Sequence, residues 1–200
     1  MTDYFALLNE PRRPWLEPAK LKSKFLILAA TAHPDKQPGA SEAERLAANR
    51  HYAEVNSAYH CLAEPKSRLL HLLELELGAR PGDVQQIPPG LANLFAEVAA
   101  TCRNADHFLN KKNEATSPLL QVQLFEQAQE WVGPLRTLQT RLAGWHDKLI
   151  EELKALDGLW MSQPGERTAL LKRLEELYRL FGYFNRWNGQ IQERIVQLSL

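Results

Sequence analysis

Apolar residues recur along most of the chain at alternating spacings of three and four, which is the period of an amphipathic α-helix. The first such face, in the segment 18–32, consists of Leu21, Phe25, Leu28 and Ala32. His33 precedes Pro34 and ends this segment, because a residue before proline avoids the α region. Alternation of the strand type and repeats of solenoid length are both missing from the sequence. The pattern therefore predicts an all-α protein.

Two further helices are predicted before a stretch that is rich in proline and glycine. Ser41 and Glu44 have the spacing of a capping box for a helix over 41–63. A shorter helix over 65–77 begins with a proline, which suits a first helical position. The stretch that follows contains three prolines and two glycines, so no regular helix runs through it. The predicted organisation is an N-terminal domain at 1–78, a linker at 79–90 and a C-terminal domain at 91–200.

The C-terminal domain is predicted to be a bundle of three long antiparallel helices. Its second helix runs from Pro118 to about Trp160, and Gly133-Pro134 interrupts it, so we expect a kink there or two helices end to end. The last helix has the most regular seam, with spacings typical of a bundle or a coiled coil. The seam consists of Leu170, Leu174, Leu177, Phe181, Phe184, Asn188, Ile191, Ile195 and Leu198.

Composition narrows the classes of function. The 24 basic and 24 acidic residues balance, which disfavours a globally basic nucleic-acid binder. Two cysteines without a CxxC pair argue against a disulfide framework and a zinc module. The N-terminus does not resemble a signal peptide, and the longest uncharged run before His33 is too short to span a bilayer. We expect a cytoplasmic protein without a cofactor, a metal, a nucleic-acid partner or a membrane partner.

The tripeptide His33-Pro34-Asp35, followed by Lys36, connects the first two helices. Pro34 fixes one backbone angle, which reduces the entropy lost on binding, and Asp35 can accept charge-assisted hydrogen bonds from a partner's arginine. A hydrolase with a His/Asp pair would also need a nucleophile and an oxyanion site, and none is nearby in the sequence. An enzyme is the least expected class. The plainest alternative is a His-Pro that merely ends a helix beside an incidental aspartate.

Three motifs occur in order in roughly the first 75 residues: Asp3-Tyr4-Phe5-Ala6-Leu7-Leu8, the tripeptide between its two helices, and the segment 55–68. This order resembles a J-domain, the part of co-chaperones that stimulates the ATPase of a DnaK-type chaperone. The resemblance implies that Asp35 meets an arginine of the chaperone. The expected chaperone-binding residues are His33, Pro34, Asp35, Lys36, Lys24 and Lys20.

The end of the N-terminal domain narrows the resemblance. The segment 68–78 has an arginine, a leucine-rich helix and a closing glycine, and the segment 177–187 has aromatic and apolar residues followed by polar and basic ones. Both segments resemble HscB-type co-chaperones of iron–sulfur cluster assembly, whose C-terminal bundle binds the scaffold protein. The implied partner is an iron–sulfur scaffold protein or another client. The expected client-binding residues are Leu94, Phe95, Glu97, Leu180, Tyr183 and Trp187.

Some features leave alternatives open. Leu180, Tyr183 and Trp187 form a row beside the seam, which either stays exposed or packs on a neighbouring helix. J-domains usually have basic residues just before the tripeptide, whereas the segment 25–32 has no charge. Its outer apolar residues therefore either pack on the C-terminal bundle or meet a partner. The rival functions are a J-like scaffold that no longer stimulates a chaperone, and a coiled-coil module or homodimer with Asn188 fixing its register.

Overall fold

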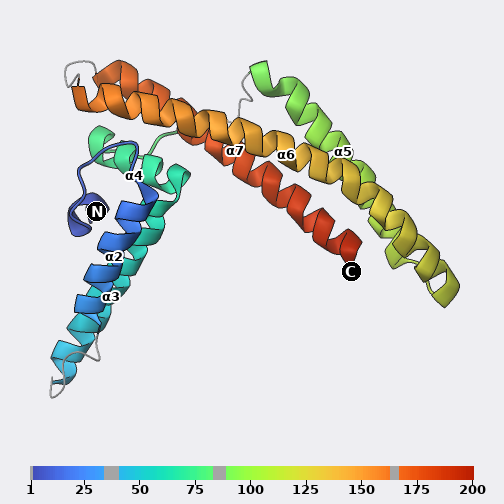
Figure 1. Cartoon of the computed structure of the whole chain (residues 1–200), viewed down its shortest axis with the longest axis horizontal. Helices are drawn as coiled ribbons and strands as arrows, with labels where there is room; N and C mark the ends of the chain where they lie inside the picture. Colours follow the sequence, from blue (N-terminus) through green and yellow to red (C-terminus); the bar gives the residue numbers. More distant parts are fainter. Residues whose placement is uncertain (1, 34–40, 83–88, 163–166) are drawn as a thin grey trace. The chain divides into compact units, whose positions relative to one another are not determined.

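The computed structural model describes residues 2–33, 41–82, 89–162 and 167–200, and every regular element in these ranges is a helix (Figure 1). The predicted all-α class is confirmed. The elements are α1 (Tyr4–Leu7), α2 (Pro18–Ala32), α3 (Glu42–Ala63), α4 (Pro65–Leu77), the 3-10 helix η2 (Pro89–Leu91), α5 (Ala92–Asn113), α6 (Pro118–Ser162) and α7 (Arg167–Ser199). None of the described helices is long and apolar enough to cross a membrane.

The chain divides into two compact units. Unit 1 consists of Met1–Gly82 and Ile150–Arg179, and unit 2 consists of Asp83–Leu149 and Leu180–Leu200. The helices α6 and α7 therefore each contribute a stretch to both units. The predicted domains, 1–78 and 91–200, stay a prediction. Unit 1 also contains the end of α6 and the beginning of α7, which the prediction assigns to the C-terminal domain.

Local capping sets where the short helices begin and end. Asp3 accepts hydrogen bonds from the backbone N–H groups of Phe5 and Ala6 at 3.0 and 3.2 Å, which starts α1. The predicted capping box at the start of α3 is confirmed, since Glu44 accepts from the Ser41 N–H at 2.8 Å and Ser41 accepts from the Glu44 N–H. Gly78 ends α4 with a φ of 71°, a left-handed conformation that favours glycine.

The expectation of two helices end to end at Gly133-Pro134 is wrong, because α6 continues through Pro134. A proline inside a helix costs about 3 kcal/mol relative to alanine. Val132, Leu135 and Leu138 are buried on the two sides of this position. Burying these three side chains along one face offsets the cost, so packing keeps α6 in one piece.

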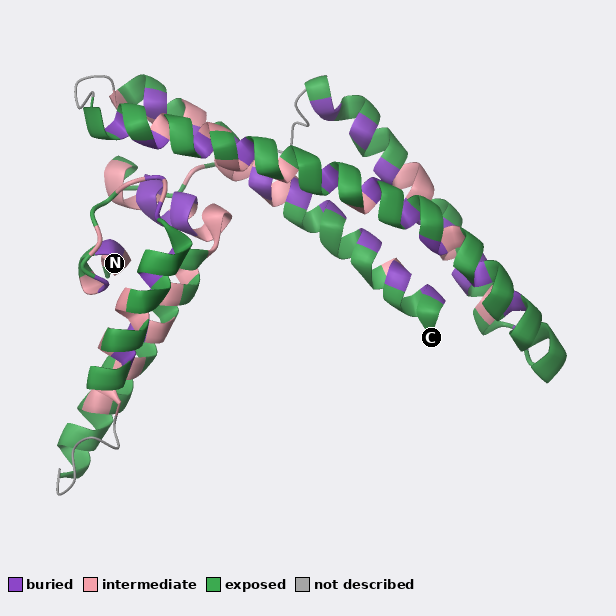
Figure 2. Cartoon of the chain, in the orientation of Figure 1, coloured by how far each residue is buried: buried purple, intermediate pink, exposed green. Residues whose placement is uncertain are grey.

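The predicted seam of α7 is buried with one exception. Its leucines, isoleucines and phenylalanines are at most 8 % exposed, whereas Asn188 is exposed. Figure 2 shows the buried residues recurring along α5, α6 and α7, separated by exposed ones. This is the arrangement that the three-and-four spacing predicts for a helix with one covered face.

Candidate functional site

The helices α2 and α3 of unit 1 lie side by side (Figure 1). Phe25 of α2 stacks on Tyr59 of α3 with ring centroids 4.1 Å apart, and His33 contacts Tyr52 edge-on at 5.4 Å. His33 is the residue that ends α2, in an extended conformation with ψ of 127°, as its place before a proline requires. These two contacts fix the second half of α2 and its last residue against α3. Pro34, Asp35 and Lys36 themselves lie outside the described residues.

Lys24, predicted to bind a chaperone, makes contacts within its own unit. Its Nζ donates to the backbone oxygen of Asn9 at 2.8 Å and forms an ion pair with Glu10 at 2.8 Å. Asn9 has a φ of 54°, so this lysine stabilises a tight turn after α1. Lys20, the other predicted lysine of α2, is exposed.

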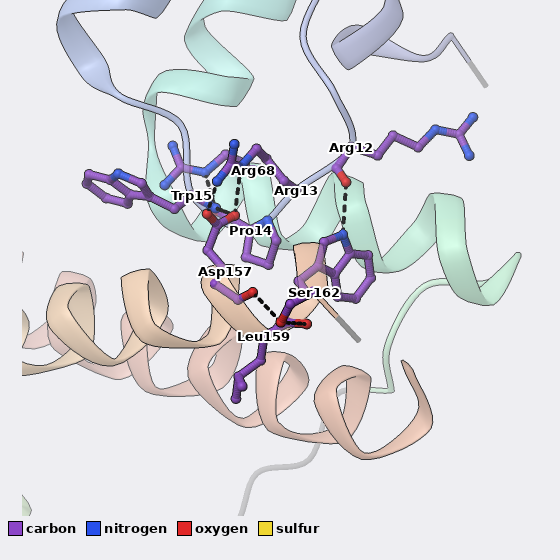
Figure 3. Close-up of polar contacts among 10 residues, drawn as sticks. Arg12, Arg13, Pro14, Trp15, Arg68, Asp157, Leu159 and Ser162 are labelled. Atoms are coloured by element: carbon purple, nitrogen blue, oxygen red, sulfur yellow. Dashed lines mark hydrogen bonds and ion pairs between the residues drawn. The ribbon is translucent and has the colours of Figure 1, made fainter. Parts of the chain in front are cut away.

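A buried carboxylate in unit 1 holds the segment that leads into α2. Asp157 of α6 accepts hydrogen bonds from the Arg13 guanidinium, whose Nε lies 2.9 Å from Oδ1, and from the Trp15 backbone N–H at 3.1 Å (Figure 3). The hydrogen bond to Asp157 raises the pKa of Arg13. On the same stretch of α6, the Trp160 indole donates to the Arg12 backbone oxygen at 2.9 Å. The N-terminal segment is thus fixed to α6 by directional contacts.

Arg68 of α4 contacts the same segment from a second element. Its Nε donates to the Pro14 backbone oxygen at 2.8 Å, and its Nη1 donates to the Leu62 backbone oxygen at 2.6 Å. The guanidinium lies over the Trp15 ring at 5.4 Å, and burial lowers its pKa to about 10. It is therefore still protonated at neutral pH. Arg68 joins the end of α3 to the segment before α2 through two charge-assisted hydrogen bonds.

His71 of α4 positions the N-terminal motif. Its Nε2 accepts a hydrogen bond from the Tyr4 backbone N–H at 3.0 Å, and its ring stacks on Phe5 at 5.8 Å between centroids. Burial lowers the pKa of His71, which agrees with a neutral ring that accepts at Nε2. The aromatic residues of the motif are therefore fixed against α4 by one histidine.

Sequence reasoning found only part of this polar cluster. The arginine at 68 belongs to the motif that suggested the HscB type, whereas Asp157 and Trp160 were not anticipated. Asp157 and Arg13 are 144 positions apart. Helix periodicity does not predict which side chains meet when they are so far apart in the sequence. The only sign that Asp157 has a polar partner is its place on the buried face of a helix, where an aspartate is rare.

The predicted client-binding residues of unit 2 meet in one aromatic cluster from two helices. Phe95 of α5 lies 6.1 Å from Trp187 of α7 between ring centroids, and Tyr183 lies 5.9 Å from the same ring. Trp187 is only 3 % exposed, so the alternative of packing on a neighbouring helix holds for this residue. Phe95 is 40 % exposed and Tyr183 is partly exposed. The surface of the cluster therefore consists of Phe95 and Tyr183 above a buried Trp187.

The remaining predicted client-binding residues differ in exposure. Leu94 is 6 % exposed and belongs to the core, and Leu180 is partly exposed. Glu97 is exposed and forms an ion pair with Arg141 of α6. Such an exposed pair contributes little to stability, so Glu97 can exchange Arg141 for a partner at small cost.

No cluster of three or more His, Cys, Asp or Glu side chains suited to a metal ion occurs in the described residues. Cys61 and Cys102 are both free, and burial raises the pKa of Cys61 to about 11. At neutral pH this sulfur is a thiol, which is a poor nucleophile and a poor ligand.

Two adjacent helices, α2 and α3, whose connecting sequence begins with His-Pro-Asp, followed by long helices, resemble a J-domain with a C-terminal helical region. Comparison with known proteins makes this more specific, although no family model matches the chain. The co-chaperone protein HscB homolog of Bordetella pertussis is 39 % identical over 72 residues. The homologs of Bordetella parapertussis and Bordetella bronchiseptica give the same values. The match covers 36 % of this chain and 42 % of the relative, so it spans less than half of that protein's length.

Two solved structures have the fold of the whole chain. The chaperone HscB from Vibrio cholerae superposes with a TM-score of 0.61 at 21 % identity, covering 100 % of both chains. The human co-chaperone protein HscB gives a TM-score of 0.59 at 21 % identity and covers 98 % of this chain and 81 % of that one. The predicted resemblance to HscB-type co-chaperones is confirmed by the named relatives, and the shared fold by these structures.

Proposed function

We propose that this chain is a co-chaperone that docks on a DnaK-type chaperone through unit 1 and presents a client on unit 2. The observation that carries the proposal is the packed α2–α3 hairpin, in which His33 is fixed against Tyr52 directly before Pro34-Asp35. A rigid support of this kind lowers the entropy cost of docking a short polar loop. The co-chaperone activity is proposed because the similar Bordetella proteins are named co-chaperones. The proposed compartment is the cytoplasm, which suits two free thiols.

The docking step is tested with Asp35→Asn. We expect this variant to lose stimulation of the chaperone ATPase, because an amide cannot replace the carboxylate in a charge-assisted hydrogen bond to arginine. The measurement is single-turnover ATP hydrolysis by a DnaK-type chaperone with increasing co-chaperone. Circular dichroism should show an unchanged fold. Normal stimulation by Asp35→Asn would contradict the proposed docking.

The client step rests on the aromatic cluster of unit 2. Phe95 and Tyr183 are the exposed part of the cluster, and aromatic side chains with a rigid support are frequent binding hot spots. We propose an iron–sulfur scaffold protein as the client. Tyr183→Ala should weaken its binding by about tenfold or more and leave ATPase stimulation by the free co-chaperone unchanged. Calorimetric titration with the scaffold protein measures the first effect, and unaltered affinity would remove Tyr183 from the site.

A further inference from the structure

The half of α2 that leads to His33 has an open apolar face. On the opposite side of α2, Leu21 in the first half and Ala29 in the second half are buried. Leu26 and Ile27 are 54 % and 68 % exposed, and Ala30, one turn after Leu26, is exposed as well. These three residues, here called the α2 strip, are continuous along the helix surface. Exposed aliphatic residues next to one another are unfavourable in water, in contrast to a single exposed leucine.

The α2 strip has no charge of its own. Residues 25 to 32 contain no charged side chain, and the nearest lysine, Lys24, is paired with Glu10. The exposed Lys20 and Lys22 lie in the first half of α2. Lys22 is 11 positions before His33, which is about 16 Å along a helix and roughly twice the Debye length at physiological salt. Attraction between these lysines and an acidic surface near His33 is therefore strongly screened.

We propose that the α2 strip is the contact surface of α2 for the DnaK-type chaperone, and that burial of apolar surface drives this contact in place of charge pairing. The inference rests on the proposed function. The chaperone is the occupant because the strip continues directly to His33, the first residue of the docking tripeptide. A partner that engages residues 33 to 35 meets Ala30 within the preceding turn and Leu26 and Ile27 within the next.

The strip is tested with the double variant Leu26→Ser and Ile27→Ser. The concentration of co-chaperone that gives half-maximal ATPase stimulation should rise by about tenfold or more, because two apolar contacts are lost at the centre of the interface. Leu46→Ser on α3 is the matched control: Leu46 is 59 % exposed, but its neighbours one turn away, Glu42 and Arg50, are charged. This control should stay within about twofold of the unchanged chain.

Salt separates the apolar contact from charge pairing. Raising the salt concentration from about 50 to about 300 mM should change the half-maximal concentration by less than about threefold, since apolar burial is only weakly screened. A steep salt dependence would overturn the inference. So would a larger loss for Lys20→Gln with Lys22→Gln than for the serine pair.

The outcomes distinguish the inference from the function on which it rests. No stimulation by the unchanged chain, or full stimulation by Asp35→Asn, removes the proposed docking and the inference with it. Normal stimulation by the serine pair, with Asp35→Asn inactive, removes the inference alone. Sedimentation gives the last check: if the serine pair dissociates a dimer and stimulates normally, the strip is covered by a second copy and the inference is wrong.

Discussion

Among the residues that the structure describes, unit 1 buries three polar side chains, Arg68, His71 and Asp157, whereas the buried side chains of unit 2 are apolar. In unit 1 these groups join segments that are distant in sequence through hydrogen bonds with defined directions. In unit 2 the polar contacts between helices, such as Arg194 with Asp106, are at least partly exposed. The two units therefore resist substitution in different ways.

The difference has a physical basis. A buried polar group that loses its partner costs its full desolvation penalty, and no rearrangement of apolar neighbours restores the hydrogen bond. An apolar seam instead loses stability in proportion to the volume removed, and it tolerates replacements of similar size. Unit 1 should thus be sensitive to chemical identity and unit 2 to volume. Four substitutions test this contrast.

Trp187→Ala should have the largest effect, because it removes the largest volume from the core of unit 2. The side chain is 3 % exposed and contacts Phe95, Tyr183 and Phe184. We expect unfolding in urea to show a loss of about 4 kcal/mol, typical of a buried tryptophan replaced by alanine. Trp145→Ala, at a site that is 39 % exposed, is the matched control and should cost less than about half as much. Equal losses would contradict a volume-sensitive core.

Asp157→Ala should be the most damaging small change in unit 1. It leaves the Arg13 guanidinium and the Trp15 N–H without their acceptor. Because the Arg13 side chain is 32 % exposed, water partly replaces the lost carboxylate, and we expect a loss of about 2 kcal/mol. Asp147→Ala on the same helix is the control, since Asp147 is exposed and should change stability by less than about 0.5 kcal/mol. Chemical denaturation of both variants measures the difference. Similar stability of the two variants would show that the polar cluster does not stabilise unit 1.

The contrast also explains what the sequence could predict. The burial of the apolar seam residues of α7 can be predicted from their spacing alone, because apolar side chains at this spacing lie on one face of a helix. The Ser41–Glu44 capping box is equally local, and it is confirmed. The contact between Asp157 and Arg13 depends on how α6 packs within unit 1, and spacing carries no information about it. Trp187 lies between these cases: its helix position was known, but its burial depends on Phe95 of another helix.

The continuity of α6 also shows that a local sequence rule cannot include the effect of packing. The local effect of a proline predicts either a kink or an end of the helix at Pro134, and the end does not occur, because contacts made by neighbouring turns keep α6 continuous. The tripeptide motif was recognisable from the sequence. The sequence also shows that the second half of α2 has no charged residue. It does not show that Lys24 pairs with Glu10, because that contact depends on the fold.

His71→Leu tests a smaller polar contribution in unit 1. The Tyr4 N–H would lose its acceptor, for an expected loss of about 1 kcal/mol near pH 7.5. Because burial lowers the folded-state pKa of His71, its contribution is complete above the unfolded value of about 6.5 and is lost as the pH falls through the folded pKa. The unchanged chain should therefore lose stability over this range. The leucine variant should lack that part of the slope, and identical slopes for both would contradict a neutral buried His71.

Asn188→Ala should have the smallest effect. Asn188 has the spacing of a seam residue but is exposed, and it accepts a hydrogen bond from Gln139 at 3.2 Å. Gln139 also donates to Gln192 at 2.9 Å, so it keeps a partner in the variant. The free energy of unfolding in urea should change by less than about 0.5 kcal/mol, whereas Ile191→Ala in the next, fully buried seam position should cost about 3 kcal/mol.

Sedimentation of Asn188→Ala tests the rival coiled-coil function. If Asn188 fixed the register of a dimer, its loss would change the oligomeric state, because a buried asparagine in a coiled coil selects one arrangement. An unchanged mass together with unchanged stability would instead leave the seam as an interface within a single chain.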